Sequence, residues 1–173
     1  MNRIFKLLVM ISSMIILDQM TKGYFQSNYK LGQSVPIIDG FFNFTYVQNR
    51  GAAFGFGATS GDWFRITFFK VLPVFVVLAL IYIIWKERNE KTKAWISWAY
   101  GLIVAGAVGN LIDRIGLDYV VDFLDFYIGN SHYPAFNVAD SCISTAFVMI
   151  VIDMIQEERR KKLETNTAEN RSD

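Results

Sequence analysis

The sequence predicts a membrane protein: an all-α bundle of four transmembrane helices, with a small external β-sheet or cradle and a short interfacial helix. Of its 173 residues, 53% are hydrophobic and only 19% are charged, against about 25% charged residues in soluble domains. The apolar residues gather in four segments, each long enough to cross a hydrocarbon core about 30 Å thick. We expect a single membrane domain at residues 1–163, because residues 164–173 are polar, lack aromatics and predict a disordered tail.

The four predicted spans differ in detail. Pro73 lies within the second, which is acceptable in a membrane because neighbouring helices can satisfy the freed backbone groups. The first begins like a signal peptide, but residues 18–22 contain no small-residue cleavage site, so we expect a retained helix. The spans cover about residues 4–24, 66–85, 94–112 and 135–155.

Basic residues set the expected orientation. Cytoplasmic loops of membrane proteins carry an excess of Lys and Arg close to the spans. With four spans, the basic clusters all fall on one side, so we expect both termini in the cytoplasm and residues 25–65 and 113–134 outside. The clusters are Arg3 and Lys6, then Lys86, Arg88, Lys91 and Lys93, then Arg159, Arg160, Lys161 and Lys162.

The external segment, about residues 25–61, is too long for a bare loop. Residues 35–38 and 41–47 predict two short strands around an Asp-Gly turn. Residues 62–69 predict the short interfacial helix, with Trp63 as a membrane-surface anchor.

Composition argues against several other classes of protein. The net charge of +1 gives no reason to expect nucleic-acid binding, which leaves a strongly basic footprint. Cys142 is the single cysteine, so an internal disulfide is excluded. The sequence offers few ligands for a metal site. It contains one histidine, His132, and has neither paired cysteines nor an H-E-x-x-H motif. Nothing in the sequence requires more than a monomer.

Asp140 lies inside the last apolar segment. An ionisable group at membrane depth costs about 3 kcal/mol on insertion scales and is a functional-site candidate by default. Span three runs outward and span four returns, so their outer ends are neighbours. The segment between Asp122 and Asp140 is long enough to leave the membrane surface and turn back, so both carboxylates can meet near the outer interface.

Two facing carboxylates are suited to hydrolysis. Like charges a few ångströms apart cannot both ionise easily, so one proton is shared. The ionised partner can take a proton from water while the protonated partner polarises a carbonyl. The pair titrates as a unit, so neither role is assigned to one residue.

Polar residues lie three or four positions from these and other acids, a spacing that places them on one helix face. Gly101, Ala105 and Gly109 form a stripe of small residues that permits close helix packing in membranes. The polar sets are Asn110 with Asp113 and Arg114, Asn137 with Asp140, and Asp18 with Lys22.

Five motifs in order resemble those of the bacterial lipoprotein signal peptidase (signal peptidase II) family. The resemblance covers about residues 4–157, and only Gly55, where the family often has serine, departs from it. The motifs are Asp18-Gln19-x-Thr21-Lys22, Asn49-x-Gly51-Ala52-Ala53-Phe54, Gly109-Asn110-Leu111-Ile112-Asp113-Arg114, Val121-Asp122-Phe123 and Phe136-Asn137-Val138-Ala139-Asp140-Ser141.

The resemblance implies an intramembrane aspartic endopeptidase of the bacterial cytoplasmic (inner) membrane, with its active site near the outer face. Such an enzyme removes the signal peptide from diacylglyceryl-modified prolipoproteins and cleaves before the lipidated cysteine. The implied partners are lipid-modified prolipoprotein signal peptides and membrane lipids, and no metal or organic cofactor is implied.

The resemblance also assigns roles to residues. Asp122 and Asp140 would be the catalytic pair, and motif alignment favours Asp122 over the nearby Asp125. Apart from the resemblance, the spacing of glycines and aromatics at residues 51–57 predicts that Phe54 and Phe56 close over the site. The supporting residues would be Asn49 and Gly51 in the external loop, Asn110, Arg114 and Asn137 beside the substrate backbone or the pair, and Asp113 as a structural acid. Asp18, also counted among the supporting residues, is expected from its position to be a structural partner of Lys22 or of external backbone amides.

Other interpretations stay open from the residues alone. Asp140 could simply complement a helix dipole. A proton-coupled transporter would spread acids through the bilayer and commonly contain a repeat. A metal-dependent lipid enzyme would use carboxylates such as Asp113, Asp118, Asp122 and Asp125 as ligands. A non-catalytic assembly factor would tolerate Asp140→Asn.

Overall fold

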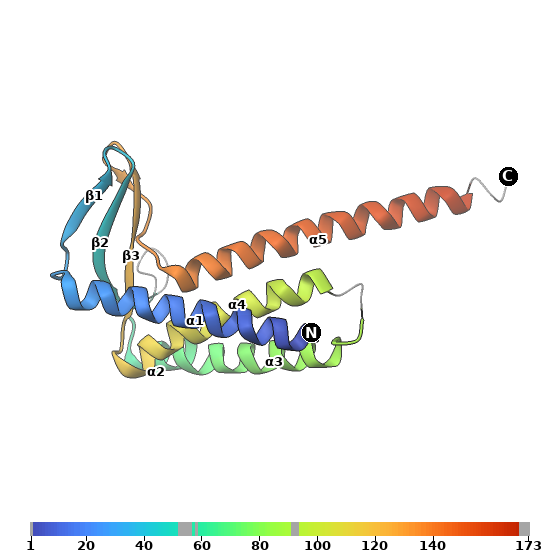
Figure 1. Cartoon of the computed structure of the whole chain (residues 1–173), viewed down its shortest axis with the longest axis horizontal. Coiled ribbons are helices and arrows are strands. Elements are labelled where there is room, and N and C mark those ends of the chain that lie inside the picture. Colours follow the sequence, from blue (N-terminus) through green and yellow to red (C-terminus); the bar gives the residue numbers. More distant parts are fainter. Residues whose placement is uncertain (1, 52–56, 58, 91–93, 170–173) are drawn as a thin grey trace.

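The computed structural model describes residues 2–51, 57, 59–90 and 94–169. Within them, four helical runs are long and apolar enough to cross a membrane, which confirms the predicted four-span bundle (Figure 1). They are α1 (Arg3–Asn28), the run Asp62–Lys86, α4 (Ala94–Gly116) and α5, which is apolar enough over Val138–Glu164.

Helix α4 is the centre of the bundle and packs against α1, α3 (Leu72–Lys86) and α5 (Val138–Glu169). Half of its apolar window is buried by protein, against 11% for α1 and 17% for α5. Small residues allow this close packing, as expected in membranes. A Cβ at Gly101 would lie 2.7 Å from Met10 of α1, and one at Gly106 would lie 2.7 Å from Ile143 of α5. These glycines therefore set how near the helices approach.

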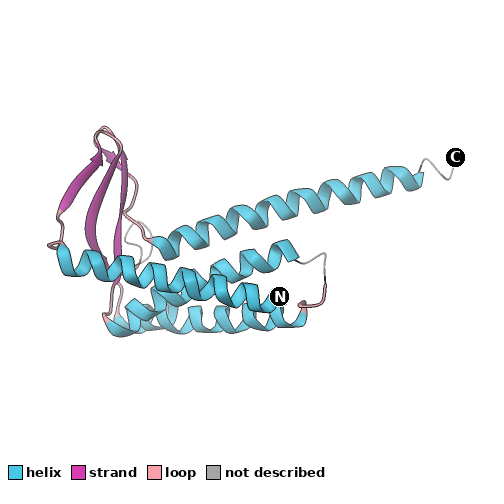
Figure 2. Cartoon of the chain, in the orientation of Figure 1, coloured by secondary structure: helices cyan, strands magenta, loops and turns pink. Residues whose placement is uncertain are grey.

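A four-stranded antiparallel sheet lies across one end of the helices (Figure 2). Its first two strands confirm the predicted hairpin, with Gly40 at φ +78° in the turn. The third strand lies where the sequence predicted only an external connection. Its first four residues are all buried, so it lacks the alternation of apolar and polar residues that marks a strand. The strands, in sheet order, are β1 (Ser34–Ile38), β2 (Phe42–Asn49), β3 (Val120–Ile128) and β4 (Ser131–His132).

Aromatic packing fixes the sheet to the end of α1. The ring of Phe25 stacks on that of Phe123 in β3, with centroids 4.3 Å apart, and lies 5.0 Å from the ring of Phe44 in β2. Tyr46 and Val121 complete this buried cluster. Such aromatic pairs contribute about 0.5–1.5 kcal/mol each beyond their buried area. The cluster therefore holds β3 over the ends of α4 and α5.

The second span and the predicted interfacial helix form one continuous run. It consists of α2 (Asp62–Ile66), a π-helical turn (Thr67–Val71) and α3 (Leu72–Lys86). Trp63 in α2 is 77% exposed, as expected for an anchor at the membrane surface. The wide π turn directly precedes Pro73, whose ring would clash with the carbonyl four residues earlier in a regular helix.

Helix α5 (Val138–Glu169) continues past residue 164, where the sequence predicted a disordered tail. Its charged end is lined with ion pairs at helical spacing, such as Arg160 with Glu157 and Lys162 with Glu158. Such pairs each stabilise a helix by about 0.2–0.5 kcal/mol. In Figure 1 this end extends away from the other helices.

Candidate active site

Asp122 and Asp140 line one cavity of about 450 Å³, at the end of the bundle that carries the sheet. Asp122 lies in β3 and is only 1% exposed, and Asp140 lies in the first turn of α5. Asn137 contacts both acids. Its Nδ2 donates to Asp122 Oδ1 at 2.7 Å, and its backbone N–H faces Asp140 Oδ2 at 3.3 Å. One asparagine therefore links the two carboxylates.

Asn137 is itself fixed by the start of α5. Its Oδ1 accepts from the backbone N–H of Asp140 at 2.9 Å, which is the contact made by an N-cap residue. Its Nδ2 also lies 3.2 Å from the Val121 carbonyl oxygen. The side chain is completely buried, so the orientation of its amide is set by these partners.

Each acid has a second amide donor. Asn49 Nδ2 donates to Asp122 Oδ2 at 3.0 Å, and Asn110 Nδ2 donates to Asp140 Oδ1 at 2.8 Å. Asn110 Oδ1 accepts from Lys22 Nζ at 3.0 Å. Because lysine is only a donor, this contact turns the Asn110 amide nitrogen toward Asp140.

The surroundings of Asp122 favour its neutral form. Burial is the main cause, and the charge of Asp140 adds to it; together they raise the pKa of Asp122 from 3.8 to about 7. Hydrogen bonds from Asn49 and Asn137 and the charge of Lys22 act in the opposite direction. An acid with this pKa can hold a proton near neutral pH.

Lys22 lies buried at the centre of the supporting network. Its Nζ is 2.8 Å from Asp18 Oδ2 and 3.1 Å from Asp113 Oδ2. Sequence reasoning paired Lys22 with Asp18 by their spacing, but it missed the contact with Asp113 and did not place Lys22 among the site residues. The available signal was a lysine within an apolar segment, which is costly in a membrane unless paired.

The two structural acids hold the backbone beside the two cavity acids. Asp113 Oδ2 accepts from the N–H of Val121, one residue before Asp122, at 3.0 Å. Asp18 Oδ1 accepts from the N–H of Ala139, one residue before Asp140, at 2.9 Å. The buried ion network thereby fixes both cavity acids through their immediate chain neighbours.

Arg114 lines the cavity and contacts Gly51, which follows β2. The Arg114 guanidinium donates to the Gly51 carbonyl at 3.2 Å and lies 5.2 Å from the ring centroid of Phe69 in the π turn. The Gly51 N–H in turn donates to Asn49 Oδ1 at 2.9 Å. The predicted closure by Phe54 and Phe56 lies outside the described residues.

Asp125 takes part in a different set of contacts. Its carboxylate bonds to Thr45 Oγ1 and to His132 Nδ1, each at 2.8 Å. These residues line a neighbouring cavity of about 670 Å³, which Asp122 also borders. Within the described chain, no group of three or more His, Cys, Asp or Glu side chains is arranged to hold a metal ion. Asp122 is therefore the acid of β3 that shares a cavity with Asp140.

Comparison with known proteins decides the family. Residues 10–156 match the model of a family described as signal peptidase (SPase) II. The chain belongs to the signal peptidase II family. It is 46% identical to a lipoprotein signal peptidase of Syntrophus aciditrophicus over 85% of this chain and 90% of the relative. It is also 46% identical to one of Geobacter sulfurreducens over 92% and 96% of the two chains.

Solved structures show the same fold. One, described as a bacterial membrane enzyme structure obtained by the in meso method at 2.3 Å resolution, superposes with a TM-score of 0.80 at 33% identity, covering 92% of this chain and 93% of that one. A second, at 1.9 Å, gives a TM-score of 0.75 at 32% identity over 88% and 94%. This chain is therefore a multi-pass membrane protein of a peptidase family.

Proposed function

We propose that this protein is an intramembrane aspartic endopeptidase that removes the signal peptide from diacylglyceryl-modified prolipoproteins, cleaving before the lipidated cysteine. The observation that carries the proposal is the bridge from Asn137 to both Asp122 and Asp140 within one cavity. Membership of the signal peptidase II family supports the class of substrate.

In the proposed reaction the two acids share one proton. The pKa of Asp122, raised to about 7 chiefly by burial, keeps that proton available at neutral pH. The ionised acid takes a proton from a water molecule, whose oxygen bonds to the scissile carbonyl carbon while the protonated acid donates to the carbonyl oxygen. The carbon–nitrogen bond then breaks, the departing amine takes a proton from one acid, and a hydroxyl of the tetrahedral intermediate returns a proton to the other acid, which restores the shared proton. The pair titrates as a unit throughout.

The cavity lining suits a substrate that is partly polar and partly apolar. Ile143 and Phe136 contribute apolar surface, and Ser141 and Ser144 contribute hydroxyl groups. Asp140 lies in the first turn of a candidate span, so the pair is at the boundary of the hydrocarbon core. A diacylglyceryl-modified cysteine is held at this depth by its acyl chains, and its signal-peptide helix lies in the bilayer beside it.

For the orientation, we propose that the protein lies in the bacterial cytoplasmic membrane with both termini inside and the cavity near the outer face. The basic clusters support this direction. The Arg3 guanidinium donates to the backbone carbonyls of Glu87 and Glu90, which brings the start of α1 and the end of α3 to the same side. We propose that the protein works as a monomer, with membrane lipids and lipid-modified prolipoproteins as its partners.

The test is cleavage of a lipidated prolipoprotein by the purified enzyme. Asp122→Asn and Asp140→Asn should each reduce turnover on the order of 10⁴-fold, as loss of a catalytic group does. Asp153→Asn, almost four turns along α5 from Asp140, is the matched control and should retain activity. Substantial turnover by either cavity variant, with the protein folded, would contradict the assignment.

Two further arms sharpen this assay. Substrate without the diacylglyceryl group should be cleaved poorly, because it lacks the anchor that brings its cysteine to the cavity. A chelator should leave the rate unchanged if the two acids act without a metal. Loss of activity that returns with added divalent metal would favour the metal-dependent alternative.

A further inference from the structure

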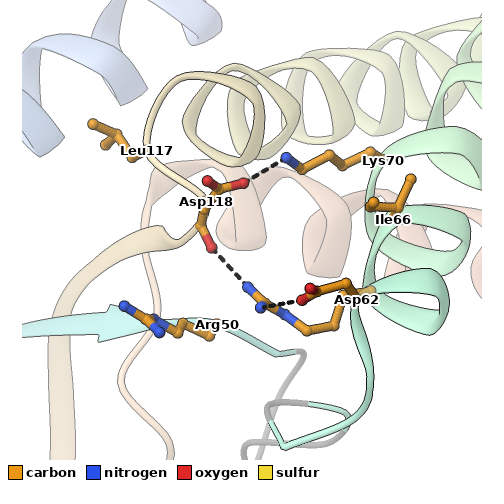
Figure 3. Close-up of a pocket in the computed structure, with 7 residues that line it drawn as sticks. Arg50, Asp62, Ile66, Lys70, Leu117 and Asp118 are labelled. Atoms are coloured by element: carbon orange, nitrogen blue, oxygen red, sulfur yellow. Dashed lines mark hydrogen bonds and ion pairs between the residues drawn. The ribbon is translucent and has the colours of Figure 1, made fainter.

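A second cavity, also of about 450 Å³, lies between the end of β2, the start of the second span and the turn from α4 to β3 (Figure 3). No described residue lines both this cavity and the cavity of Asp122 and Asp140. Three basic side chains line it, those of Arg50, Arg65 and Lys70, against the two carboxylates of Asp62 and Asp118. The cavity therefore has an excess of positive charge.

The position of this cavity corresponds to the headgroup level of a membrane. The helical run Asp62–Lys86 has 25 residues, which at 1.5 Å per residue is about 37 Å, longer than the hydrocarbon core of about 30 Å. Its first turns, with Arg65, therefore reach the polar interface, where the exposed Trp63 also belongs. Lys70 lies one to two turns deeper, and its long side chain extends to Asp118, as a lysine near a helix end commonly does.

The carboxylate of Asp118, a residue of this chain, pairs with part of the basic cluster formed by Arg50, Arg65 and Lys70. Lys70 Nζ lies 2.6 Å from Asp118 Oδ1, and Arg65 Nη2 donates to the Asp118 backbone carbonyl at 3.0 Å. The hydrogen bond from Lys70, with the charges of Lys70, Arg65 and Arg50, lowers the pKa of Asp118. Asp118 is exposed, with 75% of its side chain accessible, so another anion can reach the same cations from solvent.

Guanidinium N–H groups in this cavity are available to a ligand. Arg65 Nε is buried and has no hydrogen-bond partner among the residues that the structure describes. Arg50, on the opposite wall, makes no hydrogen bond or ion pair with the part of the chain that the structure describes, and Figure 3 draws its guanidinium apart from the dashed contacts. Guanidinium groups form bidentate hydrogen bonds with phosphate oxygens.

We propose that this cavity binds a phosphate group, that of the headgroup of an anionic phospholipid in the leaflet on the sheet side, between Arg50, Arg65 and Lys70. The modified cysteine of a prolipoprotein is not the ligand, because a diacylglyceryl thioether is neutral and carries no phosphate. The lipid site is separate from the proposed peptidase chemistry, and the experiments that test the one do not depend on the other. It does adjoin the peptidase cavity, because Arg50 precedes Gly51, whose carbonyl accepts from Arg114.

Binding of phosphatidylglycerol to the full-length protein in a neutral detergent, followed by native mass spectrometry, tests the proposal. A basic side chain near a lipid surface contributes about fivefold to the affinity for anionic lipid. Arg50→Gln should therefore weaken binding by about that factor. Lys30→Gln removes an exposed cation on the same side of the bundle that does not line the cavity, and it should leave binding unchanged.

Asp118→Asn separates a ligand site from a purely structural ion pair. Asparagine tolerates the left-handed backbone at this position, where φ is +63°. Without the internal carboxylate, Lys70 is released to the ligand, and phosphatidylglycerol should bind about fivefold more tightly. A purely structural pair predicts no gain, and unchanged or weaker binding in this variant would overturn the proposal. A thermal melt of each variant verifies that it is folded.

Two further arms identify the source of the phosphate. Zwitterionic phosphatidylcholine should bind more weakly than phosphatidylglycerol, and millimolar inorganic phosphate should not displace the anionic lipid. Displacement by inorganic phosphate would show a site for the free anion and would overturn the lipid assignment. Equal weakening by Lys30→Gln and Arg50→Gln would show general surface attraction in place of a site.

Discussion

The burial of Asp122 predicts that the stability of this protein depends on pH in a defined direction. Burial, helped by the charge of Asp140, raises the folded-state pKa of Asp122 to about 7 from its ordinary value of 3.8. A raised folded-state pKa gives a contribution to stability that is fully present below the unfolded pKa and is lost as the pH rises through the folded pKa. The wild-type protein should therefore lose stability between pH 5 and pH 8.

The size of this loss follows from the two pKa values. Each unit of difference between the folded and unfolded pKa corresponds to about 1.4 kcal/mol. Over the whole titration the contribution of Asp122 amounts to about 4 kcal/mol, and the part that falls between pH 5 and pH 8 is about 2.5 kcal/mol. For a chain of this length that is about 5–10 °C in Tm.

Comparison with Asp122→Asn isolates the contribution that titration of Asp122 makes to the unfolding free energy. The variant cannot titrate at position 122, so its unfolding free energy should vary less with pH than that of the wild type, by about 2.5 kcal/mol between pH 5 and pH 8. Thermal unfolding in detergent at several pH values measures the difference, with Asp153→Asn as the control that keeps the wild-type slope. Parallel pH profiles for the wild type and Asp122→Asn would refute the reasoning. The same proton is needed for the proposed reaction, so turnover should also fall as the pH rises above about 7.

Three other substitutions test the support of the site. Lys22→Met leaves two buried carboxylates without their cation and should destabilise the protein by about 3–5 kcal/mol, measured by unfolding in detergent; a wild-type Tm would contradict the buried network. Gly109→Ala places a Cβ 2.6 Å from Asp18 Oδ2 and should cost about 1–3 kcal/mol. Gly23→Ala places a Cβ with no neighbouring atom of the described residues within 4 Å and should be neutral or stabilising. Equal melting of the two variants would argue against the close packing of α4. Asn137→Ala removes the link between the two acids and should reduce turnover about 10²-fold, so nearly full activity in a cleavage assay would show that the link is dispensable.

The parts of the fold set by local signals could be predicted from the sequence. Span length and hydropathy identified the four helices, and an Asp-Gly pair between apolar runs identified the first hairpin. Strand β3 could not be found in this way, because its first four residues are all buried, where it pairs with β2 and packs against α1 and α4. Helix α5 continues beyond the predicted span at 135–155, because hydropathy marks only the apolar part of a helix and ignores ion pairs, such as Arg160 with Glu157, that stabilise its polar end.

The candidate site was only partly accessible to sequence reasoning for a similar reason. Spacing along one helix placed Asn110 near Asp113, and Asp18 near Lys22. The contacts that assemble the cavity join distant segments: Asp18 reaches the N–H of Ala139, and Lys22 reaches Asn110. Helical spacing gives no information about such contacts, which depend on how α1, α4 and α5 are packed together.

The buried charges of Lys22, Asp18 and Asp113 are better explained by how they position the two cavity acids than by what they add to the stability of the fold. A buried ion network is often no more stabilising than well-packed apolar residues of the same volume, so Lys22 with its two acids adds little to the fold on energetic grounds. Asp18 and Asp113 each hold the backbone N–H that precedes one of the two cavity acids, and Lys22 joins them. A single cation therefore couples the placement of Asp140 at the start of α5 to that of Asp122 in β3. In the proposed reaction the two acids share one proton although they lie on separate elements. A single cation that joins their supports would keep the distance between them constant while the surrounding helices move in the bilayer.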